Sequence, residues 1–283
     1  MIHPRTLLER YGLHASKARG QNFLNSSATA LAIARQVAPP PDGVVLEIGG
    51  GLGALTLALA SLAGRVVVLE VDRGVHQALT EILAQEGVEN VDLRLADALT
   101  ADWAGLAAEA GGPLTLAGNL PYNLTSPLLF NLLEARRHWT RGVFMVQREV
   151  AQRLAARPGG KEWGRLAVLT QAFCQVTAGS LIGRKQFYPE PQVESRLVHL
   201  TVLAEPRGGL TPDQEAWFRQ VVKAAFAQRR KMVGNSLAAG LELPRAAVDQ
   251  ALAGVELLPT RRAETMSVEE LAAAARALAP LIS

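Results

Sequence analysis

A strand, a glycine-rich turn and a helix follow one another in residues 44–60, and this order constrains the fold more than any other feature of the chain. The apolar, β-branched run at 44–48 leads into Gly49-Gly50-Gly51-Leu52-Gly53, and residues 54–60 favour a helix. Such a unit begins a doubly wound α/β sheet, and its glycines let a ligand approach the backbone. We therefore expect a ligand site where this first strand ends.

Further apolar runs alternate with helical patterns along the chain. Because strands that alternate with helices form parallel sheets, we expect five parallel strands. They lie at about residues 44–48, 66–70, 91–95, 114–118 and 143–147. Two later runs, 174–177 and 196–203, have no long helix between them. We expect these two to form an antiparallel pair at the end of the sheet.

The chain changes character after residue 205. Residues 205–212 are rich in Pro and Gly, which is typical of a linker, and the sequence beyond them is helical. Thr211 or Asp213 is expected to cap the first helix of this part. Ser267 and Glu270 are expected to form a capping box at its last helix.

Acidic side chains accompany the first three strands. Glu47 lies just before the glycines, Glu70 ends the second strand, and Asp97 follows the third. An acid at the end of the second strand suits the hydroxyls of a ribose, and Asp97 suits an adenine amino group. Glu47 suits the cationic sulfonium and amino group of S-adenosylmethionine (SAM) better than a pyrophosphate. The set favours SAM, although Gly49-x-Gly51-x-x-Ala54 also satisfies the dinucleotide fingerprint of NAD enzymes.

A second motif, Asn119-Leu120-Pro121-Tyr122, follows the apolar run at 114–118. Pro121 has no N–H and disfavours helix at Leu120, so the local carbonyls are available to a ligand. An amide oxygen, a carbonyl and a ring together suit a planar amino group such as that of a nucleobase. The alternative is an ordinary strand-to-helix turn with a chance tyrosine.

Charge is unevenly distributed along the chain. Residues 1–135 carry a net charge of −5 and residues 136–283 a net charge of +8. Two acid-poor basic clusters, at 136–165 and 216–241, favour contact with nucleic-acid phosphates over a merely solubilising surface. The expected RNA-binding residues are Arg136, Arg137, Arg148, Arg153, Arg229, Arg230 and Lys231.

Composition places the chain in a broad class. No apolar run approaches the roughly 20 residues of a membrane span, and no apolar segment typical of a signal peptide follows Met1. The single cysteine, Cys174, excludes an intramolecular disulfide and a cysteine zinc cluster. We expect a cytoplasmic protein that uses no metal and contacts no membrane.

With these motifs in this order, the chain resembles the ribosomal RNA adenine N6-dimethyltransferases, the KsgA/RsmA family, to which the macrolide-resistance rRNA methylases are related. The resemblance covers nearly the whole chain and rests on residues 21–24, 46–56, 70, 97, 119–122, 187–195 and 228–237. Three positions depart from the family pattern: Gly50 stands where Pro is usual, Gln192 where Lys is usual, and Glu194 where Asp is usual.

The resemblance implies a Rossmann-like SAM-dependent methyltransferase sheet, mostly parallel with an antiparallel strand at the end. This domain, with a basic N-terminal extension, would occupy residues 1–205, and a small all-α RNA-binding domain residues 206–283. The implied reaction is N6,N6-dimethylation of two adjacent adenines in a hairpin near the 3′ end of small-subunit (16S) rRNA, within an assembling 30S particle. The alternatives are a macrolide-resistance-type 23S rRNA adenine methylase and a non-catalytic rRNA-binding assembly factor. A monomer is expected.

The site residues expected on these grounds form two groups. The catalytic group is Asn119, Leu120, Tyr122 and Phe187, and the cofactor-binding group is Asn22, Leu24, Glu47, Gly49, Gly51, Glu70, Asp97 and Asn119. Asn119 and the Leu120 carbonyl would accept the two N–H bonds of an adenine amino group and so restore the nucleophilicity of its nitrogen. Tyr122 and Phe187 would hold the base by stacking.

Overall fold

The computed structural model describes residues 2–16, 20–39, 42–228 and 230–282, and the chain divides into two compact units. The first comprises Met1–Ala151 and Thr177–Val202, and the second comprises Gln152–Val176 and Leu203–Ser283. The domain boundary predicted at residues 205 and 206 stays a prediction. By its contacts, the segment Gln152–Val176 belongs to the same unit as the helical C-terminal part. The prediction had assigned this segment to the first domain.

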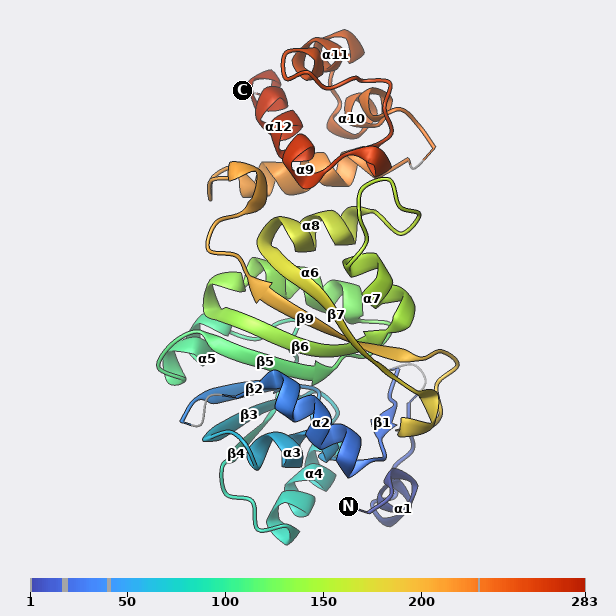
Figure 1. Ribbon diagram of the computed structural model, residues 1–283. Helices are drawn as coiled ribbons and strands as arrows, with labels where there is room; N and C mark the ends of the chain where they lie inside the picture. Colours follow the sequence, from blue (N-terminus) through green and yellow to red (C-terminus); the bar gives the residue numbers. More distant parts are fainter. Residues whose placement is uncertain (1, 17–19, 40–41, 229, 283) are drawn as a thin grey trace. The chain divides into compact units, whose positions relative to one another are not determined.

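A seven-stranded sheet in the order β4-β3-β2-β5-β6-β9-β7 forms the framework of the first unit (Figure 1). Its strands are β2 (Val44–Ile48), β3 (Arg65–Glu70), β4 (Val91–Leu95), β5 (Leu114–Asn119), β6 (Trp139–Gln147), β7 (Cys174–Ile182) and β9 (Ser195–Val202), and β7 belongs to this unit from Thr177 onward. Strands β4, β3, β2, β5 and β6 are parallel, and β9 is antiparallel to β6. The predicted fold class, a mostly parallel sheet with an antiparallel strand near its end, is confirmed.

The helices of this unit cover both faces of the sheet. They are α1 (Pro4–Arg10), α2 (Ser27–Val37), α3 (Ala54–Ala60), α4 (Arg73–Gln85), α5 (Trp103–Glu109), α6 (Thr125–Glu134) and the start of α7 (Arg148–Leu154), with the short helices η1 (Arg136–His138) and η2 (Arg184–Gln186). Figure 1 shows α2 and α3 in front of the sheet and α6 behind it. Covering on both faces explains why β2 and β3 are almost continuously apolar and buried.

A small second sheet brings together two segments that are far apart in the sequence. Strand β1 (Phe23–Leu24) pairs with β8 (Phe187–Tyr188) in antiparallel register, Leu24 opposite Phe187. Phe23 reaches the glycine turn, where a Cβ on Gly51 would lie 3.1 Å from its ring. The segment around β1 is therefore fixed both to the glycine turn and to the segment around β8.

The second unit is helical. It contains α8 (Arg165–Phe173), α9 (Glu215–Ala225), α10 (Val233–Leu241), α11 (Arg245–Ala253) and α12 (Val268–Leu278), with η3 (Arg207–Gly209), η4 (Ala263–Thr265) and η5 (Ala279–Leu281). Indole nitrogens tie its segments together: Trp163 donates to the Met266 carbonyl at 2.9 Å, and Trp217 to the Ala275 carbonyl at 2.7 Å. None of the helices in the described part of the chain has the length and apolar character that a bilayer crossing requires.

The two capping predictions for this unit have different outcomes. The capping box of Ser267 and Glu270 at the start of α12 is confirmed. The prediction that Thr211 or Asp213 caps α9 is wrong. A turn precedes that helix, in which the Gln214 N–H donates to the Thr211 carbonyl, so the N-cap residue is Gln214 and its side chain makes no cap hydrogen bond.

Candidate active site

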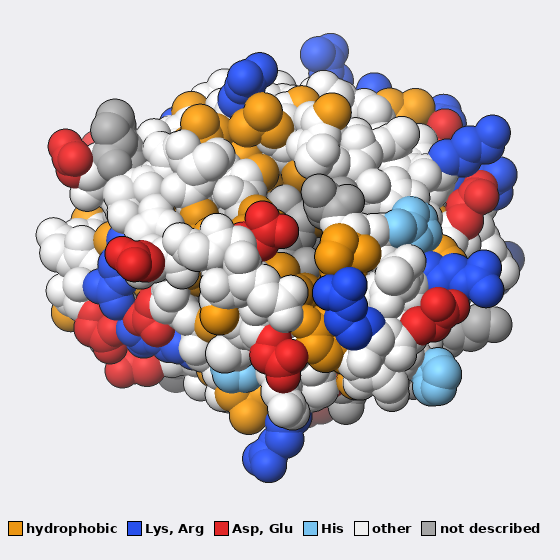
Figure 2. Space-filling model, turned by 90° about the horizontal axis from the view of Figure 1, so that it is seen from below, with side chains coloured by type: hydrophobic (Ala, Val, Ile, Leu, Met, Phe, Trp, Pro, Cys, Tyr) orange, Lys and Arg blue, Asp and Glu red, His pale blue; other side chains and the backbone are white. Residues whose placement is uncertain are grey.

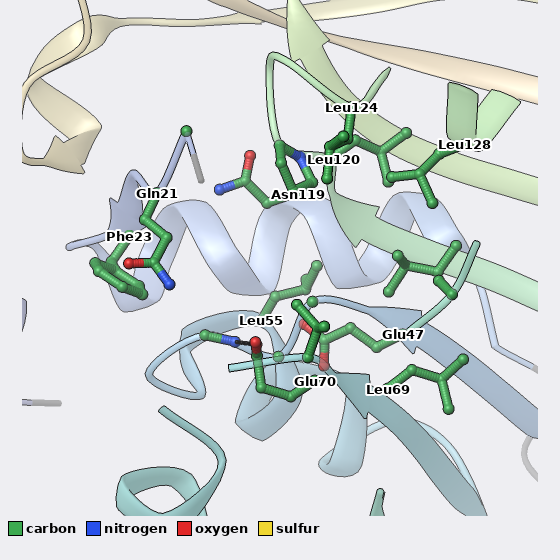
Figure 3. Close-up of a pocket in the computed structure, with 18 of the residues that line it drawn as sticks. Gln21, Phe23, Glu47, Leu55, Leu69, Glu70, Asn119, Leu120, Leu124 and Leu128 are labelled. Carbon is green, nitrogen blue, oxygen red and sulfur yellow. Dashed lines mark hydrogen bonds between the residues drawn. The ribbon is translucent and has the colours of Figure 1, made fainter. Parts of the chain in front are cut away.

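A cavity of about 290 Å³ lies at the carboxyl ends of β2, β3 and β5. This is where a doubly wound sheet binds its ligands. Figure 3 shows Asn119 and Leu120 on one side of the cavity and Glu47 and Glu70 on the other. The cavity thus brings together the glycine turn, the acidic strand ends and the 119–122 motif, as predicted from the sequence.

The glycine turn has a backbone that other residues rarely adopt. Gly49 has a φ of 78° and Gly51 a φ of 54°, both in the left-handed region that favours glycine. The Gly49 N–H donates to the Leu69 carbonyl at 2.8 Å, which fixes the turn to the end of β3. Both glycines line the cavity, and their role in binding a cofactor stays a prediction.

Glu70 faces the cavity and also holds the turn in place. Its carboxylate accepts the Gly51 N–H at 3.0 Å through one oxygen and the Asp72 N–H at 2.9 Å through the other. Burial raises the pKa of this carboxyl, since the side chain is only 5% exposed. A carboxylate oxygen has more than one lone pair, so Glu70 retains acceptors for a ligand hydroxyl. The supporting role toward Gly51 was not predicted.

Glu47 is the most deeply buried acid of the site. It is 1% exposed, and burial raises its pKa to about 8, with nearby Glu70 adding to the shift. The Thr56 hydroxyl donates to its carboxyl group at 2.6 Å. Burial therefore favours the protonated form of this carboxyl group in the free protein. The role of Thr56 was missed in the sequence analysis, because the bond crosses the glycine turn.

Asp97 differs from the other two acids in being exposed. It lines the cavity just after β4 and accepts the Leu99 N–H at 2.9 Å through one oxygen. Its second oxygen is the acceptor available to a ligand at the cavity's edge. Asp97 can therefore contact a ligand group with little cost of desolvation.

Residues 20–24, here called the N-terminal strap, form a further wall of the cavity. The Asn22 carbonyl accepts a hydrogen bond from the Asn119 side-chain nitrogen at 2.8 Å, and Leu24 lines the cavity while packing in the core. Gln21 donates to the Asp72 carboxylate at 3.2 Å, which ties the strap to the start of α4. The predicted residues Asn22 and Leu24 thus lie at the cavity, and Gln21 is an addition.

The 119–122 turn forms part of the cavity wall. Because the side-chain nitrogen of Asn119 is used by the strap, its Oδ1 oxygen is the atom available to a ligand. The Leu120 N–H donates to the Met145 carbonyl at 3.1 Å, and the Thr125 hydroxyl donates to the Pro121 carbonyl at 2.9 Å. Tyr122 lines the same cavity. The turn is thus held from both sides, and Asn119 and Leu120 both line the cavity.

Phe187 does not lie where its expected stacking role requires. The ring is 2% exposed and packs in the hydrophobic core with Leu24 and Leu197, and the residue does not line the cavity. Its pairing with Leu24 in the small sheet explains the burial. Of the two rings expected to stack, Tyr122 lines the cavity, as does Phe23, and stacking by Phe187 would require its ring to leave the core.

Most of the residues expected to bind RNA lie at the surface, in different environments. Arg137, Arg230 and Lys231 are exposed, and Arg136 is half-buried with a bond to the Leu133 carbonyl. Arg148 pairs with Glu194 at 2.9 Å, and Arg153 lies 3.5 Å from Glu162. Arg229 is outside the described residues.

Figure 2 shows a face on which acidic and basic side chains are interspersed, so RNA contact is not expected from charge there. The RNA-binding role of the basic residues stays a prediction.

The chain matches a family model and curated proteins over nearly its full length. The model described as ribosomal RNA adenine dimethylase matches residues 12–279. The "Ribosomal RNA small subunit methyltransferase A" of Anaeromyxobacter dehalogenans is 42% identical over 97% of each chain. The protein of the same name from Moorella thermoacetica is 41% identical, over 96% of this chain and 95% of its own.

Solved structures show the same architecture. A dimethyladenosine transferase from Plasmodium falciparum aligns with a TM-score of 0.75 at 22% identity, over 91% of this chain and 98% of its own. The 23S rRNA methyltransferase ErmE aligns with a TM-score of 0.67 at 28% identity, over 91% of this chain and all of its own. The first likeness concerns the fold alone, and the second adds a moderate sequence similarity.

Proposed function

The chain belongs to the ribosomal RNA adenine dimethylase family. On that premise, we propose that the protein binds SAM and a target adenine in this cavity and methylates two adjacent adenines in a hairpin near the 3′ end of small-subunit rRNA. The protein is a SAM-dependent small-subunit rRNA adenine dimethyltransferase. The main support for this site is that one cavity is lined both by Asn119 and by the acidic residues at the strand ends.

The donor set fits SAM. Glu70 offers carboxylate oxygens for ribose hydroxyls, Asp97 offers one for an adenine amino group, and Glu47 offers a carboxyl group for the cationic part. The positive-φ glycines let a ligand lie against the backbone without a Cβ in the way. When bound, SAM supplies an electrophilic methyl group on its sulfonium.

The chain's own contribution to the chemistry is to orient and activate the target nitrogen. The lone pair of an adenine amino group is delocalised into the ring. The Asn119 Oδ1 and the Leu120 carbonyl accept its two N–H bonds, which favours a pyramidal, more nucleophilic nitrogen. Tyr122 holds the base by stacking, worth about 1–3 kcal/mol. Positioning then supplies much of the rate, and a base within an RNA helix must first be flipped out.

The alternatives are weaker. A macrolide-resistance-type methylase acting on 23S rRNA is represented by ErmE at 28% identity, against 42% for the small-subunit relatives. A binding protein without activity has no need of a cavity that gathers Asn119, Tyr122 and the acidic strand ends. The small-subunit assignment therefore explains more of the observations.

The setting of the reaction is also a proposal. We infer that the substrate is an assembling small-subunit particle in the cytoplasm, since a hairpin near the 3′ end of the rRNA must be accessible to an enzyme that flips its bases. A monomer suffices, because each group named above comes from one chain. The chemistry described calls for no metal.

The experiment supplies radiolabelled SAM to the protein with small-subunit particles that lack the modification, and with large-subunit particles as the control. We expect up to four methyl groups per small particle, mapped by reverse transcription to two adjacent adenines. Label in the large subunit would favour the macrolide-resistance reading, and the absence of label in either would reject catalysis.

A further inference from the structure

Ser195 lies next to the cavity residue Tyr122, although 73 positions separate them in the sequence. The Tyr122 hydroxyl and the Ser195 Oγ are 2.7 Å apart, and either can be the donor. Ser195 is 0% exposed and does not line the cavity. Among the described residues, the tyrosine is its hydrogen-bonded link to the site.

The sheet brings these two residues together. Strand β6 lies between β5 and β9: Asn119 pairs with Met145 on one side, and Ser195 pairs with Gln147 on the other. Since a shift of one residue would turn the Ser195 side chain to the opposite face, the β6–β9 register is what directs its hydroxyl toward Tyr122. The anchor is thus part of the rigid framework and not of a loop.

The hydrogen bond between the buried Ser195 hydroxyl and the half-buried Tyr122 has a consequence for the tyrosine ring. The phenolic oxygen lies on the long axis of the tyrosine side chain, so a hydrogen bond to it fixes the direction of that axis. Burial raises the pKa of Tyr122, so the hydroxyl stays protonated and the bond is kept across the physiological pH range. The opposite end of the turn is held separately, by Thr125 on the Pro121 carbonyl.

We propose that Ser195 is a positioning residue for methyl transfer, which acts by fixing the Tyr122 ring against which the target adenine stacks. The proposal rests on the proposed function, because it needs a base at the cavity. Misplacement of a reactant by about 1 Å can lower a rate by up to 100-fold, so a looser ring lowers the rate of the chemical step. SAM affinity is unaffected, because Ser195 does not reach the cavity.

The test is a double-variant cycle of Ser195→Ala, Tyr122→Phe and the two combined. Single-turnover methylation is measured at saturating SAM, with SAM affinity by calorimetry and thermal unfolding of each protein. Each single variant should lose about tenfold or more in rate, and the double variant should lose no more than the larger single loss. SAM affinity should stay within about twofold of the parent.

Matched controls come from hydroxyls without such a bond. Ser236 and Tyr11 have buried hydroxyl oxygens with no hydrogen-bond partner among the described residues, so Ser236→Ala and Tyr11→Phe should keep the parent rate. These variants separate the loss of a buried hydroxyl as such from the loss of the Tyr122 anchor.

Several outcomes would overturn the proposal. A parent rate in Ser195→Ala would do so, as would losses that multiply in the double variant, because the two hydroxyls would then act independently. Should Ser195→Ala fail to fold, Tyr122→Phe alone decides, since it removes only the bond and keeps the ring; a parent rate there rejects the anchor. If the parent protein itself does not methylate small-subunit rRNA, the proposed function fails rather than the anchor.

Discussion

The side-chain nitrogen of Asn119 donates a hydrogen bond to the backbone carbonyl of Asn22 across 2.8 Å. One residue belongs to the end of β5 and the other to the N-terminal strap, and both line the cavity. The bond sets the direction of the amide, because a side-chain NH₂ turned toward the strap leaves the oxygen for the target. In the proposed mechanism, the strap that lines the cavity thus also orients the amide that activates the target nitrogen.

Replacing Asn119 by Ala should slow the methyl-transfer step by about 100-fold, the scale found for removing one preorganised polar group from a transition state. The Leu120 carbonyl remains, so RNA affinity should change little, and the loss should fall on the rate. Single-turnover methylation of small-subunit particles at saturating SAM measures it.

The control for this variant is Asn90→Ala. Asn90 also donates its side-chain amide to backbone carbonyls, those of Ala60 and Ala63, but it does not line the cavity. It should lose stability and keep its rate at a temperature where it is folded. A parent rate in Asn119→Ala would show that the amide is not the acceptor.

Glu70→Ala should weaken SAM binding by at least about tenfold, or about 1.4 kcal/mol. The variant removes the expected acceptor for the ribose hydroxyls and also the acceptor of the Gly51 and Asp72 N–H groups. Calorimetric titration with SAM gives the affinity, and Glu81→Ala, an exposed acid on α4, is the control. An unchanged affinity in Glu70→Ala would remove this residue from the cofactor site.

SAM affinity should rise with pH between about 6 and 8 and level off above pH 8. The pKa of Glu47 in the free protein is about 8, because the side chain is buried. A bound cation favours the ionised carboxylate and lowers that pKa, so binding below pH 8 must release a proton, and this cost falls as the pH rises. Calorimetry in buffers of different ionisation enthalpy counts the protons.

Two comparisons isolate the carboxyl group. Glu47→Gln should bind SAM more weakly at high pH and without the pH dependence. S-adenosylhomocysteine, which lacks the sulfonium charge, should show a smaller pH dependence than SAM on the parent protein. Equal pH profiles for the parent and Glu47→Gln would mean that Glu47 does not face the cation.

Neutralising Arg230 and Lys231 together should weaken RNA binding and flatten its salt dependence, by up to about 0.9 in the log–log slope for each phosphate that is no longer neutralised. Both side chains are exposed. Binding to the small-subunit hairpin is measured from about 50 to 200 mM salt, with Arg35→Gln on α2 as a control for one exposed charge. SAM affinity should not change. A salt slope equal to that of the parent would leave the two residues as surface charges only.

The strands, the glycine turn and the three acids were predictable because each has a local signal. An apolar run identifies a strand, and a parallel sheet gathers the carboxyl ends of its strands at one edge. Glu47, Glu70 and Asp97 could therefore be placed at one cavity before their distances were known.

The supporting contacts could not be predicted in this way. The bonds of Ser195 to Tyr122 and of Asn22 to Asn119 depend on strand register and on the docking of the strap, which no short segment encodes. The position of the Phe187 ring also depends on a contact that the local sequence does not show. Its neighbouring prolines indicated an extended loop, but the pairing of Leu24 with Phe187 turns the ring into the core.

Variants of Phe187 can separate the core role from the stacking role expected from the sequence. Phe187→Ala should cost about 3–5 kcal/mol in the free energy of unfolding, as for other buried aromatic rings. Phe187→Leu keeps most of the apolar volume and should cost less than about 1.5 kcal/mol.

If the ring only packs in the core, the leucine variant folds and methylates small-subunit particles at nearly the parent rate. If the ring leaves the core to stack on the flipped base, the leucine variant is equally stable but loses about tenfold or more in single-turnover rate, because an aliphatic side chain offers no stacking face. The buried position of Phe187 favours the first result, and chemical denaturation together with single-turnover methylation of the same preparation distinguishes the two.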